Sequence, residues 1–184
     1  MTILCALQCA HGIYIGSDTE SIASGDFGGR RCHHGPKWAV HGQWAVGVSG
    51  QMRLQCLIAR HMRELTEGLE SPLEFTDRLI NEIFVRYDIK SRAETGAPDC
   101  GSNFMLAGPL GVIDIDCTLS VRLARPDELI ASGCGAPYAL GAAYALSGVD
   151  VTPVAVVKHA VGAAIAFDTG CGGDPWVHLL EVGR

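Results

Sequence analysis

The first two residues of the chain, Met1 and Thr2, offer a nucleophile and a base on a single residue. If the initiator methionine is removed, Thr2 carries both a hydroxyl group and a free α-amine. A neutral hydroxyl is a weak nucleophile, whereas an α-amine with a pKa of about 8 can accept its proton at neutral pH. The pair therefore predicts catalysis by an N-terminal threonine, although Met-Thr alone is a motif of low specificity.

Two charged residues further along the chain, Asp18 and Lys37, extend this chemistry. An ammonium group lowers the proton affinity of neighbouring basic groups and favours ionisation of a hydroxyl, and a carboxylate can hold that ammonium by a charge-assisted hydrogen bond. Each residue also has a simple structural interpretation. An aspartate after a strand is commonly a turn residue, and a lysine is commonly solvated.

Five segments, taken with Lys37, resemble the catalytic half of a proteasome β-type subunit. They are Thr2-Ile-Leu4, Gly12-Ile-Tyr-Ile-Gly-Ser-Asp18, Val46-Gly-Val-Ser-Gly50, Ala131-Ser-Gly-Cys-Gly-Ala-Pro-Tyr138 and Asp168-Thr-Gly-Cys-Gly-Gly173. The last two are similar to the family's Ser-Gly-Ser-Gly-x-Pro-aromatic and Asp-x-x-Ser-Gly-Gly stretches. The resemblance spans nearly the whole chain. Its compact length is similar to that of the bacterial branches, namely the heat-shock-locus V peptidase and, preferred here, the beta-proteobacterial proteasome homologue.

The resemblance implies a role for each matching residue. Thr2 would be nucleophile and base, with Asp18 and Lys37 in support, Gly50 as the oxyanion-hole donor, and Asp168, Cys134 and Cys171 around the amine. A backbone N–H in an oxyanion hole contributes about a hundredfold to a thousandfold in rate, and glycine there also permits a tight turn. The family has serine where this chain has its two cysteines. A thiol is a weaker hydrogen-bonding group than a hydroxyl, so a weak or inactive relative is an open alternative.

The match at Lys37 requires an insertion, because the stretch from Asp18 is about three residues longer than the family pattern. His33 or His34 lies nearer the ungapped position, and Lys37 is preferred because Trp38-Ala-Val continues it as a strand. The resemblance further implies a substrate side-chain pocket lined by Ile22, Val48 and Met52. An apolar corner between a strand and a helix is also typical of simple core.

Composition limits the classes of protein to which the chain can belong but does not identify one of them. With 48% apolar and 18% charged residues, the 184 residues are expected to form one domain, 1–184, with a substantial core. A net charge of −6 and an isolated Arg30-Arg31 pair argue against nucleic-acid binding. The apolar run from Val154 to Phe167 is interrupted by charge, so no membrane span is expected. Eight cysteines without a secretion signal predict reduced thiols and a cytoplasmic protein.

Other chemical motifs are weak. Cys32-His33-His34 lacks a second ligand pair at metal-binding spacing, so no metal is expected. Gly133-Cys-Gly135 lacks the third glycine of a dinucleotide fingerprint. The predicted chemistry on Thr2 needs no cofactor.

The elements that must position these residues follow from apolar periodicity and turn signals. Strands are expected at 3–7, 13–17, 37–40, 44–48, 103–107, 112–116, 119–123, 128–132 and 176–182. Helices are expected at 51–69, 72–87, 137–146 and 153–167, the second capped by Ser71 and the last by Thr152. The stretch from Ile22 to Pro36 and that from Lys90 to Gly101 are predicted to be loops.

Strands and paired helices in this order imply an α+β fold of antiparallel sheets covered by helices. By resemblance, this is the four-layer αββα sandwich of the N-terminal nucleophile (Ntn) hydrolases. The expected function is a threonine endopeptidase that cleaves peptides or unfolded proteins inside a homo-oligomeric double ring, with about twelve or fourteen subunits and fourteen preferred. An AAA+ unfoldase is a candidate partner. The alternatives are a ring-forming protein without peptidase activity and, less favoured, an amidase of small metabolites.

Overall fold

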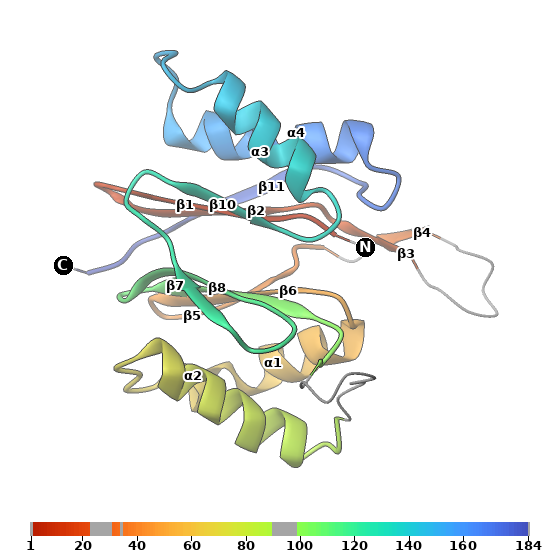
Figure 1. The fold of residues 1–184 in the computed structure, drawn as a ribbon, viewed down its shortest axis with the longest axis vertical. Coiled ribbons are helices and arrows are strands. Elements are labelled where there is room, and N and C mark those ends of the chain that lie inside the picture. Colours follow the sequence, from red (N-terminus) through yellow and green to blue (C-terminus); the bar gives the residue numbers. More distant parts are fainter. Residues whose placement is uncertain (1, 23–30, 34, 90–98, 184) are drawn as a thin grey trace.

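The computed structural model describes residues 2–22, 31–33, 35–89 and 99–183. Within these ranges the chain forms four layers, in which two antiparallel sheets pack face to face and a pair of helices covers each outer face (Figure 1). This confirms the predicted αββα arrangement. None of the helices in the described ranges is both long and apolar enough to cross a bilayer.

The first sheet carries the N-terminus on an inner strand. Its strands, in order across the sheet, are β10 (Leu129–Ser132), β1 (Leu4–Cys9), β2 (Gly12–Ser17) and β11 (Trp176–Leu180). The register pairs Leu4 with Ser132 on one side and with Ser17 on the other. The start of β1 is therefore fixed by a neighbour on each side.

The second sheet has the order β5 (Trp38–His41), β6 (Trp44–Ser49), β7 (Asn103–Gly108), β8 (Gly111–Ile115) and β9 (Val121–Leu123). A separate two-stranded hairpin joins β3 (Glu20–Ile22) to β4 (Arg31–His33). The loop predicted between Ile22 and Pro36 is therefore wrong in part. These short strands lack apolar alternation and owe their extended form to pairing with each other.

Helices α3 (Ala136–Ala145) and α4 (Pro153–Phe167) cover the first sheet. The second sheet is covered by α1 (Met52–Thr66) and by α2 (Pro72–Arg78), which continues as the π-helical turn η1 (Leu79–Val85). Ser71 caps α2, because its hydroxyl accepts the Glu74 N–H at 3.1 Å. Thr152 stands at the N-cap of α4 but its side chain makes no capping bond, so the predicted hydroxyl cap is wrong. Pro153 in the first turn needs no N–H partner there.

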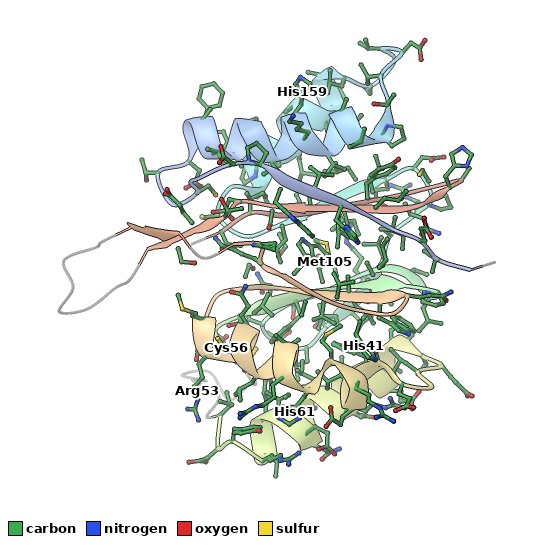
Figure 2. All side chains as sticks on the ribbon, turned by 180° about the vertical axis from the view of Figure 1, so that it is seen from behind. His41, Arg53, Cys56, His61, Met105 and His159 are labelled. Atoms are coloured by element: carbon green, nitrogen blue, oxygen red, sulfur yellow. The ribbon has the colours of Figure 1, made fainter. Side chains whose placement is uncertain are left out.

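Each interface between layers contains an apolar cluster. One lies under α1 and α2, one between α3, α4 and the first sheet, and one between the two sheets. Figure 2 shows Met105 in the cluster between the sheets. Side chains on the two faces of β1 belong to two different apolar clusters. Leu4 packs between the sheets, whereas Cys5, together with Ile3 just before the strand, packs against the helices. A strand that is buried on both faces has a nearly continuous run of apolar residues in its sequence, and β1 has such a run.

The seven cysteines within the described residues are free thiols, and Cys32 has a described backbone alone. His61 is buried, and its Nε2 lies 2.6 Å from the Tyr87 hydroxyl. The predicted loop at Lys90–Gly101 lies mostly outside the described residues.

Candidate active site

Thr2 lies just before β1 and is held mainly through its backbone. Only 4% of its surface is exposed. Its nitrogen donates to the Sγ of Cys134 at 3.3 Å, and its carbonyl accepts the N–H of Gly135 at 3.5 Å. The turn between β10 and α3 therefore fixes the position of this residue.

Asp18 and Lys37 form a buried ion pair next to Thr2. Their side chains are 0% and 1% exposed, and the Lys37 Nζ lies 2.8 Å from both Asp18 oxygens. The same ammonium donates to the Glu20 carbonyl at 2.5 Å. Asp18 also accepts the N–H of Ile3, the residue after Thr2, at 3.0 Å. A charged pair at this depth is stable only when its hydrogen-bonding capacity is used, as it is here.

The loop after α4 closes the site from the opposite end of the chain. The N–H of Gly172 donates to Asp18 at 3.2 Å, and its carbonyl accepts the N–H groups of Thr19 and Glu20, each at 3.2 Å. Asp18 therefore accepts hydrogen bonds from three separate segments, which fixes its carboxylate in one orientation.

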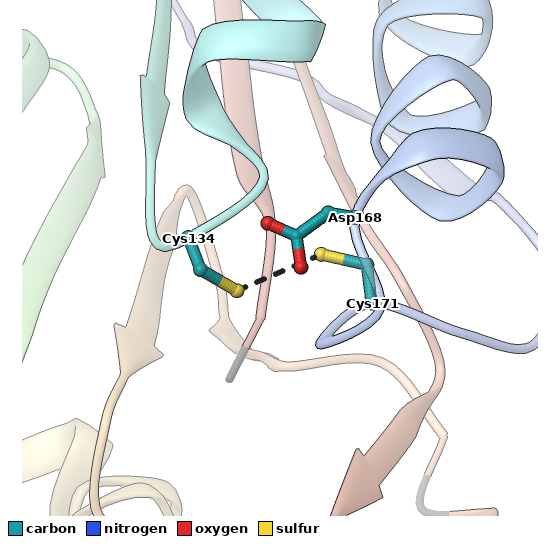
Figure 3. Close-up of side chains that lie close together, drawn as sticks. All are labelled: Cys134, Asp168 and Cys171. Atoms are coloured by element: carbon teal, nitrogen blue, oxygen red, sulfur yellow. Dashed lines mark hydrogen bonds between the residues drawn. The ribbon is translucent and has the colours of Figure 1, made fainter.

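Cys134, Asp168 and Cys171 meet beside the nitrogen of Thr2. One ligand-type atom of each lies within 4.8 Å of the other two, and the two sulfurs are 4.0 Å apart (Figure 3). The N–H of Gly170 donates to Asp168 at 2.6 Å and orients the carboxylate. Burial, reinforced by the negative charge of Asp18, raises the pKa of the Cys171 thiol well above its usual range. Cys171 is therefore protonated at neutral pH, which disfavours it as a nucleophile.

Two glycines shape the ends of the strands around Thr2. Gly133 has a φ of +105°, and a Cβ there would overlap the Thr2 carbonyl. Gly50 has a φ of +139° at the junction of β6 and α1, where a Cβ would overlap Ser102. The hydroxyls of Ser49 and Ser132 lie 3.4 Å apart and join the two sheets. Gly50 therefore follows Ser49, whose hydroxyl contacts Ser132 on β10, the strand paired with β1.

The residues predicted to line a substrate pocket occupy different environments. Val48 is 3% exposed and packs in the core beneath α1, whereas Met52, at the start of α1, is 38% exposed. Ile22 ends β3, and His33 ends β4, but their side chains lie outside the described part of the chain, as does His34. The structure brings Lys37 to Asp18, and the catalytic role of each of these residues stays a prediction.

Sequence reasoning missed three groups that hold the site together. The Ser17 hydroxyl accepts the Lys37 N–H at 3.1 Å, and Gly172 and Ser132 make the contacts described above. All three belong to the quoted motifs, yet a serine or glycine beside a motif residue gives no separate signal of a partner across the fold.

The described residues also line a cavity of about 570 Å³ at the far end of β1. Its lining includes Gln8, His11 and Asp127 and does not include Thr2. It brings together none of the predicted catalytic residues, so the candidate site is the end of β1 that carries Thr2.

No family model matches the chain, and no curated protein matches its sequence. Similar solved structures include the bacterial proteasome homologue (BPH) of Thiobacillus denitrificans, alone and in complex with epoxomicin. Each aligns with a TM-score of 0.81 and 20% identity over 99% of this chain and at least 99% of its own. The eukaryotic HslV of Trypanosoma brucei aligns with a TM-score of 0.67 and 17% identity over 97% of this chain and 99% of its own. The chain has the proteasome-type Ntn-hydrolase fold, which confirms the predicted resemblance at the level of fold.

Proposed function

We propose that this protein is a threonine endopeptidase whose nucleophile is Thr2, exposed by removal of Met1. The observation that carries the proposal is the buried Asp18–Lys37 pair, whose carboxylate binds the N–H of Ile3 next to Thr2. A buried ion pair contributes little net stability to a fold, and buried ionisable groups are concentrated at functional sites. The likeness to a structure in complex with epoxomicin gives further support.

The chemistry follows from the groups around Thr2. The free α-amine accepts the hydroxyl proton as Oγ attacks the substrate carbonyl, and it then gives that proton to the leaving amine. The ammonium of Lys37 favours the ionised hydroxyl electrostatically, and Asp18 fixes the ammonium. The N–H of Gly50 is the proposed oxyanion donor. Water then hydrolyses the acyl-enzyme, with the same amine as base.

The proposed pocket for the substrate side chain has Met52 at its surface. Val48 packs in the core beneath α1, and Ile22, at the end of β3, completes the set of residues that the sequence predicts for this pocket. No cofactor takes part in this scheme.

We further propose that the subunits assemble into a double ring, with fourteen subunits preferred over twelve, because an enclosed nucleophile spares folded proteins. Apolar side chains on the outer helices support this assembly, since Tyr144 and Phe167 are 81% and 70% exposed. Apolar surface of this kind marks protein contacts. Unfolded cytoplasmic proteins are the proposed substrates, delivered by an AAA+ unfoldase. Light scattering coupled to size exclusion tests the assembly, and a stable monomer or dimer at micromolar concentration would contradict it.

A second candidate is a ring-forming protein with little or no peptidase activity. The observation that favours it is the contact between the Thr2 nitrogen and a thiol, the Sγ of Cys134. A thiol is a poorer hydrogen-bonding partner for an amine that must gain and lose protons.

Epoxomicin labelling followed by intact-mass measurement separates the two candidates. Chains that lack Met1 should gain the mass of one inhibitor at Thr2, and chains that retain Met1 should gain none, because they have no free α-amine beside the hydroxyl. Thr2→Ala should abolish labelling and reduce kcat/KM by at least about a thousandfold. Thr118→Ala, which removes an exposed hydroxyl elsewhere, should change neither. Labelling of Met1-bearing chains with retained turnover would exclude the mechanism.

Serine substitutions test whether a cysteine is the nucleophile instead. If the thiols are imperfect replacements for hydroxyls, Cys134→Ser and Cys171→Ser should keep or raise the peptidase rate. Loss of activity in either variant, together with activity in Thr2→Ala, would assign the reaction to a cysteine.

A further inference from the structure

The cluster beside Thr2 contains two sulfurs and a carboxylate that come from two separate parts of the chain. Cys134 lies in the turn that begins α3, Asp168 ends α4, and Cys171 follows in the loop that reaches Asp18 (Figure 3). The nitrogen of Thr2 lies 3.3 Å from the sulfur of Cys134. In a chain without Met1 that nitrogen is a primary amine, so the cluster presents four donor groups.

Two separations between these groups are close to those in a tetrahedral zinc site. With Zn–S bonds of about 2.3 Å and Zn–N bonds of about 2.0 Å, tetrahedral ligands stand about 3.8 Å apart for two sulfurs and about 3.5 Å apart for sulfur and nitrogen. The corresponding separations are 4.0 Å between Cys134 and Cys171 and 3.3 Å between Cys134 and Thr2. These two separations differ from the tetrahedral values by only a few tenths of an ångström, and an oxygen of Asp168 lies within 4.8 Å of both sulfurs.

The surroundings of the cluster also favour a cation. Two carboxylates lie beside the thiols: Asp168 belongs to the cluster, and Asp18 accepts the N–H of Gly172, the residue after Cys171. Surroundings of this kind attract a divalent ion, and a bound ion in turn stabilises the thiolates. Lys37, the cation already present, is bound to Asp18. Cys134 is exposed, so an ion can enter from solvent.

We propose that Cys134, Asp168, Cys171 and the α-amine of Thr2 form a Zn²⁺ site that controls the nucleophile. Binding releases one proton from each thiol to solvent and forms two zinc–thiolate bonds, one bond to the carboxylate and one to the amine nitrogen. The amine lone pair that would accept the hydroxyl proton is then held by the metal. Zinc therefore inhibits the peptidase reversibly, a consequence that rests on the proposed function, whereas metal binding itself does not.

Cobalt(II) is the direct probe of the site, because thiolate–cobalt bonds give charge-transfer absorption in the near ultraviolet and tetrahedral cobalt absorbs strongly in the visible. Titration of the full-length protein, kept reduced with a phosphine, should show both features with an end point at one equivalent. Zinc should then displace cobalt and abolish the absorption. Absence of the thiolate band in the folded protein would overturn the proposal without the use of any variant.

Variants assign the ligands. Zinc affinity, measured by competition with a chromophoric chelator, should fall by at least about a hundredfold in Cys171→Ser, since loss of a partner outside the ligand shell already costs about tenfold to a hundredfold. The matched control is Cys56→Ser, an exposed thiol on α1 in the opposite helix layer (Figure 2). It should bind zinc as the parent does. Equal affinity in Cys171→Ser and the parent, or a loss in Cys56→Ser, would refute the assignment.

The role of the amine is tested by comparing chains with and without Met1. Chains that retain Met1 should keep the thiolate band but bind zinc more weakly, because an amide nitrogen is not a ligand. Equal affinity would remove Thr2 from the site. The two proposals fail separately. A thiolate band without epoxomicin labelling supports the metal site and argues against the peptidase, and labelling without a band does the reverse.

Discussion

Replacement of Lys37 by methionine tests whether the ion pair beneath Thr2 is an integral part of the fold as well as of the chemistry. Methionine keeps a long unbranched side chain but removes the ammonium. The fully buried carboxylate of Asp18 would keep its hydrogen bonds from the N–H groups of Ile3 and Gly172. It would lose Lys37, its only charged partner among the described residues. The Glu20 carbonyl would lose the same donor.

The expected cost is that of breaking a buried pair. Removal of one partner typically costs about 3–5 kcal/mol, because the other charge is left buried without compensation. For a chain of this length, that loss corresponds to a decrease in Tm of about 6–20 °C. Urea unfolding followed by far-ultraviolet ellipticity, at one fixed protein concentration, gives the free energy.

The double variant Asp18→Asn, Lys37→Met isolates the cause. Asparagine can still accept the Ile3 N–H and carries no charge, so the double variant should lose less stability than the two single changes added together. The coupling should exceed about 1 kcal/mol. Activity should be absent from all three proteins, which separates stability from catalysis.

The control is Arg63→Met, which breaks the exposed pair with Glu67, where the two side chains are 72% and 66% exposed. Solvent screens such a pair, so unfolding should not change beyond experimental error. Additive losses at Asp18 and Lys37, or a Lys37→Met loss no larger than that of the control, would refute the argument from stranded charge.

Three further predictions concern assembly, ionisation and backbone strain. Tyr144→Glu places a charge on the most exposed aromatic side chain of α3, and light scattering should report smaller particles while unfolding of the subunit stays unchanged. The pKa of the Cys171 thiol is raised in the folded protein, so this thiol stays protonated above pH 9.0. The same thiol in the unfolded chain, with its ordinary pKa of 9.0, ionises there. The free energy of unfolding should therefore fall as pH rises past about 9, and peptide mapping after alkylation at that pH should find Cys56 modified and Cys171 intact. Gly133→Ala requires a non-glycine residue at a φ of +105° and forces a contact with the Thr2 carbonyl, so urea unfolding should show a loss of at least about 2 kcal/mol. Ready folding of that variant at parental stability would show that the turn around Thr2 is more adaptable than its geometry implies.

Much of the fold could be predicted because its strands are apolar and its helices carry clear start signals. The runs that became β1 and β6 were recognisable from apolar residues bounded by turns, and Ser71 marked the start of α2. The hairpin of β3 and β4 was missed because strands of three mostly polar residues are stabilised by pairing rather than by burial. The continuation of α2 as a π-helical turn likewise has no local signal, since the same residues could form an ordinary α-helix.

The candidate site, like the fold, could be predicted from the sequence only in part. Thr2 and Asp18 were predicted because their residue types carry chemistry at a spacing found in the proteasome β-type family. Lys37 was preferred because a strand follows it, although its spacing requires an insertion. Ser17 and Gly172 were missed because a hydroxyl or a backbone N–H becomes informative only once its partner across the fold is known. The proximity of the two cysteines was predicted from the resemblance, and the distance between their sulfurs was not, because helix packing sets it.

The pairing of β1 and β2 with strands from much later in the chain has a consequence for the timing of synthesis. Strand β1 pairs with β10, and its neighbour β2 pairs with β11, which lies much later in the chain. Asp18 likewise waits for Gly172 to supply one of its donors. Contacts of such long sequence separation form late. A nascent chain can therefore lose Met1 long before it can assemble the surroundings of Thr2. Under the proposed function, the order of translation delays a competent nucleophile until the loop after α4 has been made.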